Sequence, residues 1–154
     1  MHKSLKKRYE PLRKKYKLPS FVELDLEFRI SQIEGDSFLL ESIREKMAER
    51  TSHVRGVVEE ALQPDSNLAD LYESRVFSEE EKKRLFELYK KLMVADRKAL
   101  ELFILSDEQQ DAAFIKSFYE EWRRLKPQLA RFVRQLRESW EKDTEEREAV
   151  GYMG

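Results

Sequence analysis

The chain has 154 residues, of which 40% are hydrophobic and 40% charged, and its formal net charge is −1. That length is typical of one domain, and nine Phe, six Tyr and two Trp argue against a disordered chain. The absence of cysteine excludes disulfides, thiolate metal sites and a cysteine nucleophile. No run of roughly 18 apolar residues is present, so we expect no membrane-spanning segment and a cytoplasmic protein.

The first 17 residues are strongly basic, with eight Lys or Arg and a single acid, Glu10. Their apolar and aromatic residues recur every three or four positions, at Leu5, Tyr9, Leu12 and Tyr16. This spacing predicts a basic amphipathic helix. Pro11 removes one backbone donor and disfavours helix at the residue before it, so two short pieces or an arm that orders on binding are also open.

Residues 22–30, "VELDLEFRI", support two interpretations. Strict alternation of apolar and charged residues is typical of a half-buried strand. However, Ser20 and Glu23 form a capping box, and Phe21, Leu24 and Phe28 share one helical face. We predict a helix, because no other stretch offers a partner strand to satisfy the backbone donors and acceptors. If the segment is a strand, we expect it to pair across a dimer.

Two more helices follow in the middle of the chain. Asp36 can cap a helix that continues to Leu62, and Pro64 ends it before a short segment from Leu68 to Tyr72. Ser78 and Glu81 form a second capping box, which predicts a helix from Glu79. The apolar positions of this helix cover a wide face, which predicts neighbours on more than one side: Leu85, Leu88, Tyr89, Leu92, Met93, Ala99, Leu100, Phe103 and Ile104.

The last helix is the longest, with Ser106 or Asp107 as its cap. Its apolar residues follow one another at intervals of three or four, which alternate as far as Leu136: Ile115, Phe118, Trp122, Leu125, Leu129, Phe132, Leu136 and Trp140. Pro127 interrupts the backbone hydrogen bonds and should kink the helix or split it in two. The stripe continues in phase beyond Pro127, which favours the kink.

These elements predict an all-α protein, a helical bundle of about five helices with a long kinked C-terminal helix. We assign residues 1–17 to a basic N-terminal arm or helix, residues 18–150 to a single helical domain and residues 151–154 to a short tail.

Four short motifs, "YKLPSF", "LYES", "LYKKLM" and the terminal "GYMG", are spread over nearly the whole chain. With these motifs the sequence resembles an uncharacterised family of small helical archaeal proteins. The resemblance implies a cytoplasmic helical protein, and it carries no activity, cofactor or site residue to transfer.

The sequence contains no convincing catalytic or metal site. Only His2 and His53 are present, so a three-histidine zinc site cannot form, and Glu49 with His53 is an unspecific pair on a charged helix face. Four glycines leave no phosphate-binding loop. Asp96 lies in phase with apolar residues and is expected to be partly buried; an interhelical ion pair or a hydrogen bond with a tyrosine is the main interpretation, and a metal or catalytic role is the alternative. We therefore predict no catalytic residues, no metal and no cofactor.

Positive charge is concentrated in two segments. Residues 122–137 hold six Lys or Arg and no acid, and they form the second basic segment beside residues 1–17. The predicted binding residues are the basic side chains of both segments and two interleaved tyrosines: Lys3, Lys6, Lys7, Arg8, Tyr9, Arg13, Lys14, Lys15, Tyr16, Lys17, Arg123, Arg124, Lys126, Arg131, Arg134 and Arg137.

Basic residues with interleaved tyrosines point to phosphate contacts and base stacking. We predict a non-enzymatic protein that binds RNA or DNA, or a ribonucleoprotein, without sequence specificity, because no base-reading motif is visible. A helical adaptor or homo-oligomer that meets an acidic protein surface is the alternative, and a carboxylate–metal hydrolase at Asp96 or Glu60 is the third. A further alternative is that the basic N-terminal segment packs against acidic residues of the same molecule or of another subunit, since residues 18–62 hold ten acids and five bases. A membrane surface is disfavoured, because no Trp or Phe precedes residue 21.

Overall fold

The computed structural model describes residues 2–35 and 38–149, and the side chains of residues 4–35 and 38–142. Within these ranges the chain is helical and contains no strand, which confirms the all-α prediction. Its elements are α1 His2–Tyr16, α2 Phe21–Phe28, the short 3₁₀ helix η1 Ile30–Gln32, α3 Leu39–Leu62, α4 Leu68–Glu73, α5 Glu79–Leu105 and α6 Glu108–Ala149. None of the described helices is long and apolar enough to cross a membrane.

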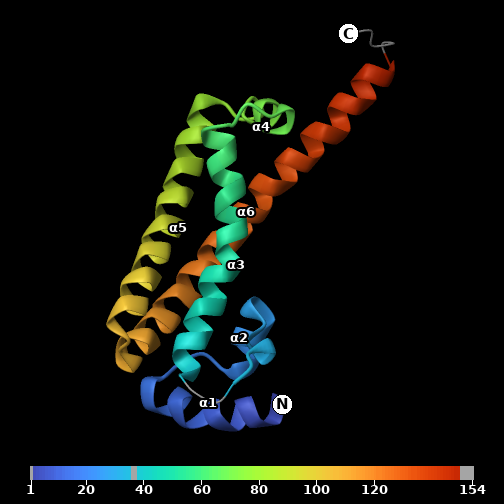
Figure 1. Ribbon diagram of the computed structural model, residues 1–154. Coiled ribbons are helices and arrows are strands. Elements are labelled where there is room, and N and C mark those ends of the chain that lie inside the picture. Colours follow the sequence, from blue (N-terminus) through green and yellow to red (C-terminus); the bar gives the residue numbers. More distant parts are fainter. Residues whose placement is uncertain (1, 36–37, 150–154) are drawn as a thin grey trace.

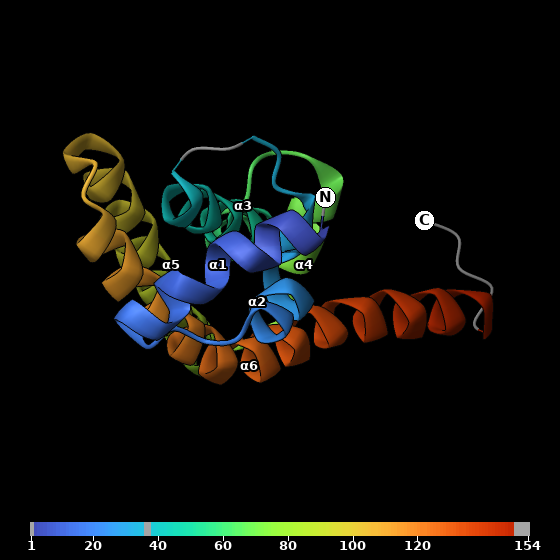
Figure 2. The ribbon, with the colours of Figure 1, turned by 90° about the horizontal axis from the view of Figure 1, so that it is seen from below.

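Three long helices, α3, α5 and α6, form the body of the protein (Figure 1). Helices α1 and α2 lie at one end of this body and α4 lies at the other, while the C-terminal part of α6 extends away from its neighbours (Figures 1 and 2). One cluster of buried apolar side chains joins α1, α2 and the three long helices, from Leu5 of α1 through Met47 of α3 to Leu136 of α6. One continuous core is expected for a chain of this length.

Residues 21–28 form a helix, so the alternative strand is wrong. The backbone N–H of Glu23 donates to Ser20 Oγ at 3.1 Å, and the backbone N–H of Ser20 donates to Glu23 Oε1 at 3.2 Å. This reciprocal cap starts the helix, and Phe21, Leu24 and Phe28 are buried on one face. Two apolar residues of the alternating pattern, Val22 and Leu26, lie on the exposed side of this helix, so the alternation does not mark a buried strand face.

Both proline-containing helices are continuous. Pro11 lies inside α1 and Pro127 inside α6, so neither helix is divided into two. Both prolines are exposed. The carbonyl that each leaves without an intrahelical donor, that of Lys7 or Arg123, is therefore on a side of the helix that water can reach. Each carbonyl can thus hydrogen-bond to water, and each helix continues through its proline.

The other helix starts agree with the sequence where they can be compared. Ser78 and Glu81 form the predicted capping box, and α5 begins at Glu79. Asp107 Oδ1 accepts from the backbone N–H of Gln109 at the start of α6. The predicted cap of α3, Asp36, lies outside the described residues, and α3 begins later than predicted, at Leu39, with Phe38 in the left-handed conformation at the N-cap position.

The wide apolar face of α5 is covered only in part. Leu85, Leu88 and Leu92 are buried, but the C-terminal turns expose Leu100, Phe103 and Ile104. The expectation that these last three residues meet neighbours within the chain is wrong. Helices α3 and α6 flank one side of α5, and no other described helix covers the opposite side.

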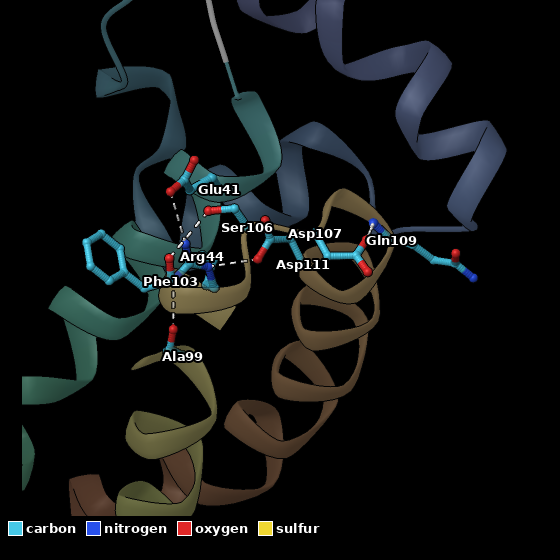
Figure 3. A network of polar contacts seen from close by, with 8 residues as sticks. All are labelled: Glu41, Arg44, Ala99, Phe103, Ser106, Asp107, Gln109 and Asp111. Carbon is cyan, nitrogen blue, oxygen red and sulfur yellow. Dashed lines mark hydrogen bonds and ion pairs between the residues drawn. The ribbon is translucent and has the colours of Figure 1, made fainter. Parts of the chain in front are cut away.

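One buried ion pair joins all three long helices (Figure 3). The side chains of Arg44 in α3 and Asp111 in α6 are 2% and 5% exposed, and Arg44 Nε lies 2.9 Å from Asp111 Oδ1. Arg44 Nη1 donates to the backbone carbonyl of Ala99 in α5 at 2.7 Å, and Nη2 lies 3.5 Å from Glu41 Oε1. Because the Nε–Oδ1 contact is not aligned as a hydrogen bond, charge is its main contribution.

We expect Asp111→Ala to lower the free energy of unfolding by about 3 to 5 kcal/mol, because it leaves a buried guanidinium without its counter-charge. Urea unfolding followed by circular dichroism measures this loss. Glu101→Ala removes an exposed ion pair with Lys98 and should change stability by less than about 1 kcal/mol. Equal losses for the two variants would show that the buried pair is not a structural determinant.

Candidate anion-binding surfaces

Helix α1 docks on the protein through the apolar stripe predicted for it. Leu5 and Tyr9 are buried, and Leu12 and Tyr16 pack against the core. The Tyr9 hydroxyl donates to the carbonyl of Pro19 at 2.6 Å, and its ring meets Phe21 edge to face. The basic N-terminal segment is therefore a docked helix and not a free arm.

The two tyrosines of α1 have internal partners. Tyr9 is fully buried, and burial raises the pKa of its hydroxyl. Its ring cannot stack on a base, so Tyr9 is removed from the predicted binding residues. Tyr16 is half-buried and donates a hydrogen bond to Glu108 Oε2 at 2.8 Å, at the first turn of α6.

The opposite side of α1 presents lysines to solvent. Four of them are exposed, Lys6, Lys7, Lys14 and Lys15, and Lys17 just beyond the end of the helix is exposed as well. Among the described side chains, the only ion pair of an α1 cation is the 3.8 Å contact of Arg13 with Glu10 in the same helix. Arg8 donates to the carbonyl of Gly35, and the side chain of Lys3 lies outside the described residues. The acids of residues 18–62 therefore do not neutralise this helix in the described structure.

The second basic segment lies along the middle of α6. All six predicted cations are exposed, but three of them have acidic partners. Arg124 pairs with Glu121, Lys126 with Glu27 and Arg137 with Glu141. Arg123 lies over the ring of Tyr119 at 5.8 Å. In the described part of the chain, Arg131 and Arg134 form no hydrogen bond or ion pair through their side chains. This face is consequently less positive than its sequence indicates.

The two basic segments do not form one surface. Tyr16 of α1 meets α6 at Glu108, and Arg123 follows fifteen residues later. At about 1.5 Å per residue, the two positions are separated by about 22 Å along the helix axis. Helix α1 crosses the end of the bundle where α6 begins (Figures 1 and 2).

Glu27 of α2 connects that helix to the basic segment of α6. Its carboxylate accepts from Trp122 Nε1 at 2.8 Å and from Lys126 Nζ at 2.9 Å. Burial disfavours the charged carboxylate, but the hydrogen bonds from Lys126 and Trp122 outweigh that cost and hold the pKa of Glu27 below its usual value. The positive charge of Arg50 in α3 acts in the same direction.

The candidate metal ligands are not assembled into a site. Asp96 lies 2.6 Å from Arg55 of α3 and 2.7 Å from Arg97, so the interhelical ion pair predicted for it is present. Two guanidinium groups at this carboxylate oppose cation binding. Across the side chains that the structure describes, no three His, Cys, Asp or Glu residues are close enough to hold a metal ion, and His53 and Glu49 are exposed.

Arg44 and Asp111 are not among the residues predicted above, although the sequence carries a signal for both. Arg44 continues the stripe of Leu40, Met47 and Thr51 at intervals of four, three and four residues. Asp111 precedes Ile115 by four residues and so lies in phase with the stripe of α6. A charged residue in phase with a buried stripe, on each of two helices, indicates a buried ion pair.

Comparison of the chain with models of protein families, with curated proteins and with solved structures gave no match. The resemblance to small helical archaeal proteins stays a prediction, and its "GYMG" motif lies outside the described residues.

We expect Glu27→Gln to weaken the link between α2 and α6 by about 1 kcal/mol at neutral pH. Because the pKa of Glu27 is lowered on folding, its stabilising contribution is present above the unfolded value of 4.5 and is lost as the pH falls through the folded value. The variant should therefore lose less stability than the wild type as the pH falls below about 5.

Urea unfolding at a series of pH values tests this prediction. Glu120→Gln is the matched control, because Glu120 is an exposed glutamate of α6 without a side-chain partner in the described residues. An acid dependence of Glu27→Gln identical to that of the wild type would contradict the assignment.

Proposed function

We propose that this protein binds anionic polymers, with RNA or DNA as the most concrete case, through the solvent side of α1. The observation that carries the proposal is the set of four exposed lysines on a docked helix, with the exposed Lys17 just beyond its end, none paired with an acid among the described residues. Because α1 is already packed on the core in the free protein, its backbone is ordered before a ligand binds. Little conformational entropy of the backbone is therefore lost on binding.

Lys7 and Lys14 are the central contacts in this proposal. They are seven residues apart and therefore lie on the same side of α1, away from Leu5 and Tyr9. Lysine ammonium groups on flexible stems can follow a phosphate backbone without a fixed register. Because Tyr9 is buried and no base-reading motif accompanies the helix, binding is led by phosphates and independent of sequence. Arg131 and Arg134 offer a separate, weaker basic face on α6.

We expect the double variant Lys7→Gln with Lys14→Gln to bind duplex DNA and RNA more weakly than the wild type. Each lost phosphate contact should also reduce the slope of log K against log salt by about 0.9 on a duplex. Fluorescence anisotropy with a labelled duplex at several salt concentrations measures both quantities. These surface substitutions leave the α1 core contacts in place, whereas deletion of α1 would remove Leu5 and Tyr9 from the core.

The matched control is Lys83→Gln with Lys91→Gln on α5, which removes two exposed lysines and the same net charge. The proposal requires that the control retain the wild-type salt slope. An equal reduction in both double variants, or no binding by the wild type, would overturn it.

A homo-oligomeric adaptor is the second candidate, and the uncovered end of α5 favours it. Leu100, Phe103 and Ile104 are 50%, 57% and 73% exposed, and Leu105 next to them is also exposed. A group of large apolar side chains on a surface is typical of a protein interface. A second copy of the chain could cover the side of α5 that α3 and α6 leave open.

Ile104→Glu with Leu100→Gln should abolish self-association without unfolding the protein, because both side chains are exposed. Sedimentation velocity at several protein concentrations gives the mass of each form. Val94→Gln is the control, since Val94 is an exposed apolar residue of α5 nearer its middle. A wild-type protein that stays monomeric at all concentrations would eliminate this second candidate.

A further inference from the structure

A third positively charged feature lies away from α1 and from the basic segment of α6, in a groove between α2, η1, α3 and α6. The groove has a volume of about 430 Å³. Phe28, Val54 and Trp122 supply its apolar lining. Its polar lining is mostly basic and consists of Arg29, Gln32, Lys46, Glu49, Arg50 and His53.

Local helix geometry and one turn bring these basic groups together. Lys46, Arg50 and His53 are separated by four and three residues and therefore share one side of α3. Arg29 comes from the opposite wall, where it ends α2 in the left-handed conformation with φ of 54° and leads into η1. Trp122 of α6, held by Glu27, contributes to the groove beside them.

The groove has more positive charge than its own acids can neutralise. Glu49 is its only acidic lining residue and contacts Lys46 at a long 3.9 Å. The nearby Glu27 is taken by Lys126 and Trp122. In the described part of the chain, Arg29 and Arg50 form no hydrogen bond or ion pair with their guanidinium groups, and both are exposed. Two guanidinium groups therefore remain open to a ligand from solvent.

We propose that this groove is a binding site for a phosphoryl group, carried either by a free phosphate monoester or by the terminal phosphate of an oligonucleotide. Arg29 and Arg50 are the principal ligands, because the planar guanidinium donates two parallel hydrogen bonds to phosphate oxygens. Lys46 adds a point charge and His53 a further donor. The volume of the groove suits a molecule of nucleotide size.

This site is separate from the polymer-binding face of α1 and does not rest on it. The α1 lysines belong to a helix at the end of the bundle, whereas Arg50 and Lys46 lie in the first half of α3. The two sites also differ in chemistry, since flexible lysines suit a continuous backbone and paired arginines suit a single phosphoryl group.

Isothermal titration calorimetry of the full chain with a nucleoside 5′-monophosphate, at constant ionic strength, tests the proposal by measuring the heat of binding. We expect saturable binding that the unphosphorylated nucleoside does not show. Arg50→Gln and Arg29→Gln should each weaken the affinity about tenfold, because each removes a charge-assisted contact to phosphate. Arg50→Lys should fall between Arg50→Gln and the wild type, since it keeps the charge and loses the paired donors.

Arg84→Gln is the matched control, because Arg84 is an exposed arginine of α5 outside the groove and its loss changes the net charge equally. Thermal unfolding verifies that each variant is folded. An affinity loss in Arg84→Gln equal to that in Arg50→Gln would overturn the proposal, because it would reduce the effect to general charge attraction.

A second titration compares 5′-phosphorylated and 5′-hydroxyl single-stranded oligonucleotides of the same sequence. Binding of the free monophosphate identifies a phosphate monoester as the ligand. Preference for the 5′-phosphorylated strand, lost in Arg50→Gln, identifies a terminal phosphate. Saturation by neither probe overturns the site. The double variant Lys7→Gln with Lys14→Gln keeps Arg29 and Arg50, so it should bind the monophosphate as the wild type does. Failure of the α1 proposal can therefore be told apart from failure of the groove proposal.

Discussion

The position of Arg44 in the core constrains the arrangement of all the long helices. A guanidinium that is almost inaccessible to water must have both a counter-charge and acceptors for its donors. Arg44 of α3 obtains its counter-charge from the Asp111 carboxylate of α6 and one hydrogen-bond acceptor from the Ala99 carbonyl of α5. A one-residue shift of any of the three helices would separate these groups, so the ion pair specifies their register as well as their contact.

Asp111 is affected by the same burial. Removal of its carboxylate from water raises its pKa, while the charge of Arg44 opposes that shift. Burial of the two charged groups therefore costs desolvation free energy. In return, the pair favours one arrangement of the three helices over other arrangements with similar apolar packing. Glu108 lies one turn before Asp111 and accepts the hydrogen bond from Tyr16, so the register of α6 also determines where α1 docks.

The placement of α1 decides how charge is distributed over the surface. With its apolar side occupied by Leu5 and Tyr9, α1 can turn its lysines only toward solvent. In α6, by contrast, part of the basic segment is neutralised by acids one turn away and by Glu27 of α2. Two segments of similar composition thus reach different electrostatic states because their neighbours differ.

Local features of this fold could be predicted from the sequence. Capping boxes at Ser20 and Ser78, and stripes such as that from Ile115 to Leu136, depend on residues three or four apart, which are neighbours in any helix. The strand alternative at residues 22–30, the alternative of a split at Pro127 and the extent of the buried face of α5 were decided by tertiary packing. In each case the outcome depends on which side of the helix is exposed to water.

Residue patterns along the chain were enough to establish that the protein is helical, where the capped helices α2 and α5 start and which segments are basic, because these properties come from neighbours along the chain. Only the tertiary structure decided that Tyr9 is buried, that Arg44 meets Asp111, and that Arg29 and Arg50 line one groove. Burial and charge pairing depend on distances through space between residues far apart in sequence, and electrostatic energy follows those distances.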